Sequence, residues 1–446
     1  MREAVEQIGQ LMAAQEIAHV LVGLFDLNGT LRGKRLSTPR FLSALKDGFR
    51  FGSIPLCWDA ADNLIDYLQL YEDHPGFPDF PARLLPASLR VLPVEGNIPL
   101  FLAEYAESGP GRDFCCRSLL RRVTRRLQDE GYESMAGIEY EFTVFNESEH
   151  SCRQKAFRDL IQAGPVPGGF SVVGTLAESE FHRELMDAAA TMGLQIEALH
   201  HETESLEAAL APAPALDLAD RAALFKMLAR AVARRHGKLA SFMARWTEKV
   251  APNGGHVHLS LRDGEGENVF RCEEGELSTP MAGFLAGLQR RLPQLTALLA
   301  PWVNSYARFW PHYVTANQMS WGIENRTCAV RVIPGSSARL EIRLPGADAN
   351  PYLTLAAILA CGLEGILTGE TPTEPMECHS YDRAMDPDYL LPATLGQAAR
   401  ALRESEFARQ TLGEVFVDHF AATREWEERE FRSQVSEWEL RRYLLL

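Results

Sequence analysis

Three segments of the chain alternate apolar with ionisable residues, the period that puts every second side chain on the same face of a β-strand. They read GIEYEFTVF at 137–145, GHVHLSL at 255–261 and RLEIRL at 339–344. One face of each strand is apolar, whereas the other carries carboxylates, imidazoles or guanidinium groups. The chain must therefore fold so that a core covers these strands on one side and a polar site forms on the other.

Two of these strands carry residue types that bind divalent metal ions. Glu139 and Glu141 share one strand face, and adjacent carboxylates on a buried strand are unfavourable unless a cation compensates them. Oxygen-rich ligand sets select magnesium or manganese over zinc. His256 and His258 likewise share a face, as paired metal ligands do. A solvent-facing edge strand explains the carboxylates about as well, and hydrogen-bonded core histidines explain the imidazoles.

Four arginines surround one acid in the third region. Arg326, Arg331, Arg339 and Arg343 lie near Glu341 in the sequence. The planar guanidinium group binds phosphate and carboxylate oxygens bidentately, although a solvated charged edge strand is the alternative for such a pattern. The chain has no glycine-rich phosphate loop of either common nucleotide-binding type. A nucleotide would therefore have to be held by metal ions and arginines.

The composition is typical of a soluble globular protein. The 446 residues, 46% of them hydrophobic, leave room for one large domain and a smaller one. A net charge of −15 argues against nucleic-acid binding. Eight cysteines without a CxxC pair indicate reduced thiols. Because we find neither a signal sequence nor an apolar run long enough to cross a bilayer, we expect a cytoplasmic protein without a membrane segment.

The order of the expected elements predicts an α+β fold with two domains. A strand–turn–strand pattern at 18–36 predicts a hairpin, and SGPGRD at 108–113 indicates a linker, so we place a strand-rich domain at 1–110 and a second domain at 111–446. Mixed hairpins and helices argue against a regular doubly wound sheet. The helices that the apolar periodicity predicts are 3–16, 117–130, 281–299, about 352–368 and 393–441.

These segments, in this order, resemble the glutamine synthetase superfamily over essentially the whole chain. The motifs that carry the resemblance are the three strands above and DLNGTLRGKRL, SFMARW, NSYARFWP, SWGIENRTCAVRV and VSEWELRRY. FMARW and SWGIENRTCAVRVIPG are more similar to the glutamate–amine ligase branch (γ-glutamylpolyamine or alkylamine synthetases) than to ammonia-assimilating enzymes. The resemblance implies a small N-terminal β-grasp-like domain and a large catalytic domain with a curved antiparallel sheet and flanking helices. It also implies a homo-oligomer of stacked rings, usually twelve subunits, with each active site between neighbours.

The resemblance assigns roles to individual residues. It implies two or more Mg²⁺ or Mn²⁺ ions per active site, held by Glu139, His256 and Glu341 and by Glu141, Glu202 and Glu207. It implies that glutamate is bound by Arg308, Arg343, Asn253 and Gly254, and ATP by Arg326, Arg331, Arg339 and Ser260. The residues closest to the chemistry would be Arg308, Arg326 and Glu341.

The reaction that the resemblance implies is the joining of the γ-carboxyl group of L-glutamate to an organic amine. ATP converts the carboxylate, a poor electrophile, into γ-glutamyl phosphate, which a polyamine, an alkylamine or ethanolamine then attacks. Two alternatives stay open. One is glutamine synthetase itself, with ammonium as the acceptor. The other is a catalytically inactive sensor or structural protein of the same fold.

The sequence departs from the ammonia-using pattern at two acids. Val314 stands where those enzymes carry a glutamate near the ammonium site, and Arg50 and Phe51 stand where they carry an aspartate. Apolar residues at these places would suit the carbon chain of an amine. Asp59 or Glu72 would then meet a second ammonium group of a diamine.

The segment HETESLE is a third departure, because it is about two residues shorter than the family pattern between its metal glutamates. Taken alone, it is an acidic helix start. Because of the shortening, Glu204 could take the place of Glu202 as a metal ligand. The shortening is also the feature that favours an inactive protein. Tyr389 lies where some bacterial glutamine synthetases are adenylylated, and we treat it as an ordinary surface tyrosine.

Overall fold

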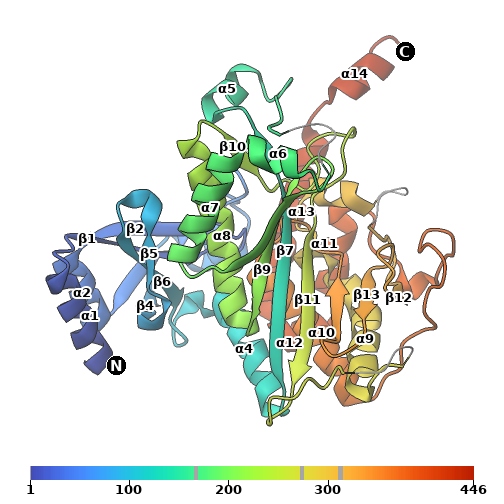
Figure 1. Ribbon diagram of the computed structural model, residues 1–446, viewed down its shortest axis with the longest axis horizontal. Helices are drawn as coiled ribbons and strands as arrows, with labels where there is room; N and C mark the ends of the chain where they lie inside the picture. Colours follow the sequence, from blue (N-terminus) through green and yellow to red (C-terminus); the bar gives the residue numbers. More distant parts are fainter. Residues whose placement is uncertain (1, 165–168, 272–275, 310–314) are drawn as a thin grey trace.

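The computed structural model describes residues 2–164, 169–271, 276–309 and 315–446, and these form two separate β-sheets with helices around them (Figure 1). The first sheet has the strand order β2-β1-β6-β4-β3, with β5 paired to β6, and only β1 and β6 are parallel. Its strands are β1 (His19–Phe25), β2 (Leu31–Ser37), β3 (Phe49–Gly52), β4 (Asp79–Leu84), β5 (Arg90–Leu92) and β6 (Ile98–Tyr105).

The second sheet contains the three alternating strands as neighbours. Its order is β12-β13-β14-β11-β7-β9-β8, with β10 paired to β7, and all pairs are antiparallel except β12 with β13. Its strands are β7 (Glu133–Phe145), β8 (Ile196–His201), β9 (Leu206–Ala213), β10 (Leu239–Ser241), β11 (Gly255–Arg262), β12 (Trp321–Ile323), β13 (Val330–Ile333) and β14 (Arg339–Ile342). The α+β class and the curved, mostly antiparallel second sheet are as predicted.

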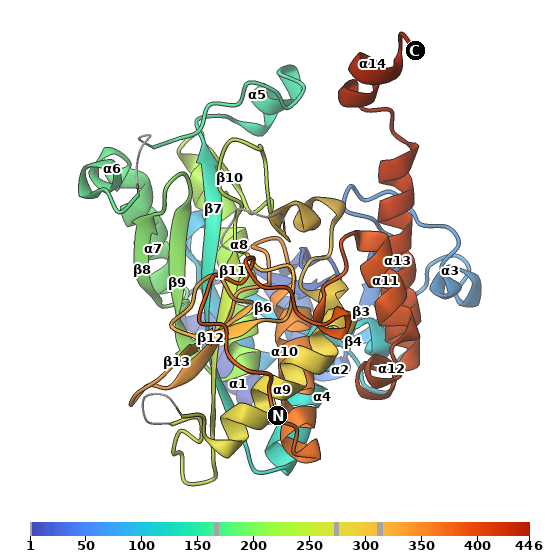
Figure 2. The same ribbon diagram turned by 90° about the vertical axis from the view of Figure 1, so that its right-hand side faces the viewer.

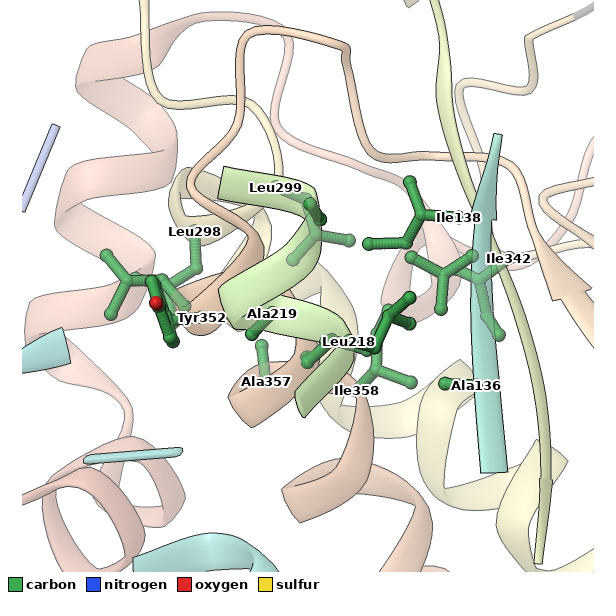
Figure 3. Packing of buried hydrophobic residues seen from close by; sticks show 14 of the residues in the cluster. Ala136, Ile138, Leu218, Ala219, Leu298, Leu299, Ile342, Tyr352, Ala357 and Ile358 are labelled. Atoms are coloured by element: carbon green, nitrogen blue, oxygen red, sulfur yellow. The ribbon is translucent and has the colours of Figure 1, made fainter. Parts of the chain in front are cut away.

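Helices fill the space around both sheets, and a few of them build the large core. In Figure 3, side chains of α8 and α10 meet Ile138 of β7 and Ile342 of β14, which point away from the charged face. The α-helices are α1 (Arg2–Ala14), α2 (Thr38–Asp47), α3 (Gln69–Asp73), α4 (Cys116–Asp129), α5 (Glu149–Gln154), α6 (Val172–Ala177), α7 (Ser179–Thr191), α8 (Ala215–Arg235), α9 (Thr279–Arg291), α10 (Pro351–Thr368), α11 (Leu395–Glu404), α12 (Glu406–Leu412), α13 (Glu414–Ser433) and α14 (Glu437–Tyr443).

Helix α10 is a longer apolar segment than the sequence analysis expected to find. By length and composition it could span a membrane, but 78% of it is buried inside the protein, between α4, α8 and α9. The Asn350 side chain caps its N-terminus, and Gly369, at φ +64°, ends it. It is therefore a core helix of the protein.

Other expectations hold with changed boundaries. The hairpin at 18–36 is confirmed as β1 and β2, joined by a turn in which Asp26 accepts hydrogen bonds from the backbone of Asn28 and Thr30. The region expected to be helical at 393–441 is confirmed as helical, but it is divided. It is four helices, α11 to α14, because Ser405 caps a new helix and Gly413 takes φ +100°. The seven cysteines in the described residues are free thiols, and all but Cys378 are buried.

One buried arginine joins the two sheet regions to the C-terminal helices. Arg424 of α13 is 1% exposed and donates to the carbonyl of Pro301 (2.9 Å) and to Asn28 Oδ1 in the β1–β2 turn (2.8 Å). Its guanidinium group also lies over the rings of Trp302 and Phe420. Burial lowers the pKa of Arg424 to about 10, so the group remains charged at neutral pH. Side chains from three distant parts of the chain thus meet on one cation.

We predict that Arg424→Ala lowers the free energy of unfolding by about 3 kcal/mol, because it leaves a cavity and two unpaired acceptors. Urea denaturation followed by fluorescence measures the change. Arg432→Ala on the same helix is the matched control, since Arg432 is exposed and its ion pair with Glu428 should contribute about 0.5 kcal/mol or less. Equal losses in both variants would contradict the role given to Arg424.

Candidate active site

Strand pairing brings the sequence-predicted acids and imidazoles onto one face of the second sheet. In the register of β7 with β11, His256 lies opposite Glu139, and in that of β11 with β14, His258 lies opposite Glu341. β9 pairs with the other edge of β7 and places Glu207 opposite Glu141. Residues from four strands therefore converge, as the alternating patterns require.

The first group consists of Glu139, His256 and Glu341. Each offers one ligand atom, and these atoms lie within 4.8 Å of one another. His256 Nδ1 is 3.8 Å from Glu139 Oε2 and 3.7 Å from Glu341 Oε1. This is the set that the sequence analysis gave to one divalent ion.

The second group is His200, Glu202 and Glu207. His200 Nε2 lies 3.0 Å from Glu202 Oε1 and 3.6 Å from Glu207 Oε1. The shortened segment closes as a turn in which the Glu202 amide donates to the carbonyl of Ser205 (2.9 Å), so Glu202 still reaches the group, whereas Glu204 does not belong to it. His200 was missed from the sequence. It stands two residues before Glu202 in an extended segment, and that spacing was the available signal.

Glu141 lies between the two groups. Its Oε1 is 3.8 Å from His256 Nε2, and its Oε2 accepts a hydrogen bond from the Gly254 amide at 2.9 Å. Gly254 must be glycine here, because a Cβ atom would overlap the His256 imidazole and stand 3.1 Å from Glu141 Oε1. The sequence analysis placed Gly254 on the substrate, and the structure shows that it also positions two expected metal ligands.

The electrostatics of the site reflect uncompensated negative charge around the second group. Burial, and to a lesser degree the nearby carboxylates of Glu139, Glu141 and Glu202, raise the pKa of Glu207 to about 8. Burial alone would also raise the pKa of Glu139, but hydrogen bonds from His256 and His258 outweigh it and lower that pKa.

The arginines have different surroundings. Arg343 and Arg331 both form ion pairs with Glu341, which is 1% exposed, and Arg331 Nη1 is 3.1 Å from Glu341 Oε2. Arg339 donates to His258 Nδ1 at 3.1 Å. These three arginines thus lie in the site, where Arg331 and Arg343 compensate an acid.

Arg308 and Arg326 are not brought against the acids. Arg308 is 1% exposed, and its guanidinium group donates to the carbonyls of Leu344 (2.6 Å) and Arg343 (3.3 Å), beneath the end of β14. Arg326 is exposed between β12 and β13 and lines another pocket, of about 610 Å³. The structure therefore leaves a catalytic role for either residue as a prediction.

A cavity of about 400 Å³ adjoins the first group. Among its lining residues are Glu139, His258, Ser260 and Arg339, together with the backbone of Gly137 on β7. Ser260 follows His256 and His258 on the same face of β11. Two of the residues predicted to bind ATP, Ser260 and Arg339, therefore share one cavity beside the acids.

The donor atoms fit divalent metal ions. Carboxylate oxygens outnumber imidazole nitrogens in both groups, which suits Mg²⁺ or Mn²⁺ rather than zinc. Several carboxylates gathered on a largely buried strand face need positive charge, which the raised pKa of Glu207 also indicates. Glu139, His256 and Glu341 would hold one ion, and Glu202, Glu207 and His200, with Glu141 beside them, a second.

The remaining predicted residues have largely structural surroundings. Asn253 is 2% exposed, and its amide group donates to the carbonyl of Met243 at 2.8 Å, while its Oδ1 atom lacks a partner. Val314 lies outside the described residues. Tyr389 is half-buried and packs against the large core rather than lying free on the surface.

Two expectations about the acceptor side are wrong. Phe51 is 5% exposed within the core of the first sheet, so it does not present an apolar surface to a substrate. Asp59 is 8% exposed and accepts hydrogen bonds from Ala61 and Asn63 in its own turn, so it is not free to bind an ammonium group. Arg50 and Glu72 are exposed.

Comparison with known proteins identifies the family of the chain and agrees with its fold. The family model described as "Glutamine synthetase, catalytic domain" matches residues 113–443. The chain therefore belongs to the glutamine synthetase family. It is an enzyme of the carbon–nitrogen ligase class that this family comprises.

Similar proteins carry names of more than one activity. Type-1 glutamine synthetase 2 of Dictyostelium discoideum is 35% identical over 94% of this chain and 82% of its own length. Gamma-glutamylethanolamide synthetase of Streptomyces coelicolor is 35% identical over 98% of this chain and 95% of its own. A glutamate–isopropylamine ligase of a Pseudomonas species is 32% identical over 99% of this chain and 98% of its own.

Solved structures extend the likeness to three dimensions. A structure described as GmaS in complex with ADP has a TM-score of 0.84 and 29% identity, covering 98% of this chain and 99% of its own. A protein described as a novel glutamine synthase homolog has a TM-score of 0.78 and 26% identity, covering 94% and 95%. The whole chain, including the first sheet, thus has the same fold as these proteins.

We predict that Gly254→Ala weakens Mn²⁺ binding at least about tenfold, because the added methyl group displaces His256 and Glu141. Titration of the purified protein with Mn²⁺, followed by electron paramagnetic resonance, measures the free ion. Gly264→Ala is the matched control, since a Cβ atom there meets nothing within 4 Å. Unchanged Mn²⁺ affinity in Gly254→Ala would show that these ligands are not held by the glycine.

Proposed function

We propose that this protein joins the γ-carboxyl group of L-glutamate to an organic amine in an ATP-dependent reaction that passes through γ-glutamyl phosphate. The observation that carries the proposal is the pair of acid and imidazole groups on one sheet face, beside a cavity of about 400 Å³. Relatives named for ethanolamide and isopropylamine products support an organic acceptor, and a neighbour in complex with ADP supports an adenine nucleotide.

The cavity residues would bind the nucleotide. Ser260 and Arg339 line it, and Arg331 lies across β14 from it, so guanidinium groups would face the phosphate oxygens. Divalent ions, when bound, would neutralise the charge that develops on the transferring phosphoryl group. Arg326 would act on the same phosphate from the loop between β12 and β13.

Glutamate would bind on the opposite side of the metal ligands. Arg343 lies beside Glu341, and Asn253 and Gly254 lie at the start of β11. Arg343 Nε and Asn253 Oδ1 both lack a hydrogen-bond partner among the described residues, which leaves one donor and one acceptor for a substrate that carries a carboxylate and an ammonium group. Arg308 would support this site from beneath β14.

The proposal also includes the location of the protein in the cell and its oligomeric state. We place the protein in the cytoplasm as a homo-oligomer, a dodecamer of two stacked hexameric rings. Mass photometry would measure the number of subunits. Polyamines, alkylamines and ethanolamine are the candidate acceptors.

Ammonium is the second candidate acceptor, and the name of the Dictyostelium relative favours it. The burial of Phe51 removes one argument against ammonium, whereas the absence of an acid at positions 50 and 51 still counts against it. An inactive protein is disfavoured, because the shortened segment keeps Glu202 beside His200 and Glu207.

We predict that phosphate release with ATP, Mg²⁺ and L-glutamate is stimulated most by an organic amine. The measurement compares ammonium, ethanolamine, isopropylamine and a diamine at equal concentrations and confirms the γ-glutamyl product by mass spectrometry. A preference for ammonium would identify a glutamine synthetase instead. No turnover with any acceptor would identify the inactive alternative.

We also predict that Arg326→Ala lowers kcat by about a hundredfold or more while the fold is unchanged, because a cation on the phosphoryl group is lost. Steady-state kinetics and circular dichroism measure the two effects. Arg400→Ala, an exposed position on α11, serves as the control. Wild-type turnover in Arg326→Ala would remove this residue from the site.

A further inference from the structure

A second cavity, of about 440 Å³, lies at the junction of the two sheet regions. We call it the α8 cavity. It is enclosed by the β1–β2 turn, α8, β10 and α13, and its lining includes Lys226, Arg230, Phe242, Asp348 and Glu427. Figure 1 shows α8 between the first sheet and strands β7 and β9.

The α8 cavity is on the other side of the second sheet from the metal-ligand groups. Lys226 Nζ lies 5.5 Å from the ring centroid of Tyr140. Tyr140 stands between Glu139 and Glu141 on β7, so its side chain points to the opposite face from theirs. A ligand in this cavity would therefore be separate from the reacting groups.

Two cations in the α8 cavity form no ion pair with any of the described residues. Lys226 is 7% exposed, and its Nζ donates to the carbonyl of Ala349 at 3.1 Å. Arg230 lies over the ring of Phe242. Among the described residues, no carboxylate is within ion-pair distance of either cation. Burial, together with the nearby Arg230, lowers the pKa of Lys226 to about 7, and the charge of Asp348 opposes this shift only in part.

Two acids in the same cavity form no ion pair among the described residues, although Arg308 and Lys226 lie near enough to Asp348, and Arg424 near enough to Glu427, to lower the pKa of each acid in part. Asp348 Oδ2 accepts a hydrogen bond from Ser305 at 2.6 Å, but Asp348 Oδ1 is buried without any partner. Burial raises the pKa of both Asp348 and Glu427. Buried polar atoms are normally paired, so these incomplete groups indicate that something else completes them.

We propose that the α8 cavity binds a free amino acid, with its carboxylate on Lys226 and Arg230 and its ammonium group on Asp348. A zwitterion offers a carboxylate to Lys226 and Arg230 and an N–H donor to the unpartnered Asp348 Oδ1, whereas a simple anion would leave that oxygen without a donor. The Phe242 and Trp302 rings offer apolar contact to a side chain. Asp348 accepts a hydrogen bond from Ser305, and Ser305 lies on the same 3₁₀ segment as Arg308. A ligand on Asp348 is therefore connected through this segment to the charged face of the second sheet.

Isothermal titration of the full-length protein with glycine, in the absence of ATP, tests this site. We expect saturable binding to the wild type, and weaker binding by about tenfold in Lys226→Met and in Asp348→Asn, since each loses a charge-assisted hydrogen bond. Acetate, which lacks the ammonium group, should bind about tenfold more weakly than glycine. Arg230→Met, at an exposed position, repeats the test if Lys226→Met does not fold.

Arg343→Gln is the control for binding on the other face, and it should retain glycine binding in the α8 cavity. Three results would overturn the proposal. They are no binding to the wild type, wild-type affinity in both Lys226→Met and Asp348→Asn, or loss of binding in Arg343→Gln alone. Because the titration requires no turnover, its outcome is independent of the ligase reaction.

Discussion

Negative charge gathered on one face of an otherwise apolar sheet is the constraint on which the rest of the structure depends. Glu341 is 1% exposed and is stabilised by Arg331 and Arg343, while the other acids of the face have fewer cationic partners. Burying carboxylates costs free energy unless cations balance them. The sheet can keep these acids because its opposite face is packed against α8 and α10, and the missing positive charge is what a divalent ion would supply.

Much of this arrangement could be predicted because strands are periodic. Alternation in β7, β11 and β14 placed Glu139, His256 and Glu341 on polar strand faces, and the family resemblance implied that they form one ligand set. Antiparallel register then aligns the strands that carry them. His200 was missed because its role depends on the register of β8 with β9. Phe51 and Asp59 were misjudged because sequence does not reveal which way a side chain faces in a short strand or turn. There, core packing and local hydrogen bonds decided the outcome.

Some buried polar residues form the charged face of the second sheet, whereas others hold separate parts of the fold together. Arg424 and Asn350 hold the β1–β2 turn against the second domain through hydrogen bonds, and neither lies on the charged face. The C-terminal helices α11 and α13 lie together, and α14 extends beyond them (Figure 2). The first sheet is therefore held against the rest of the protein by buried polar contacts and by an apolar core that includes Phe25 and Leu102, rather than by a shared sheet.

The central claim is that the two groups on the charged face bind divalent ions beneath a nucleotide. A crystal structure of the protein soaked with Mn²⁺ and a non-hydrolysable ATP analogue tests it most directly. The account predicts anomalous density for one ion between Glu139, His256 and Glu341, a second beside Glu207, and the nucleotide in the cavity lined by Ser260. An ordered analogue elsewhere, with no metal density between these side chains, would contradict it.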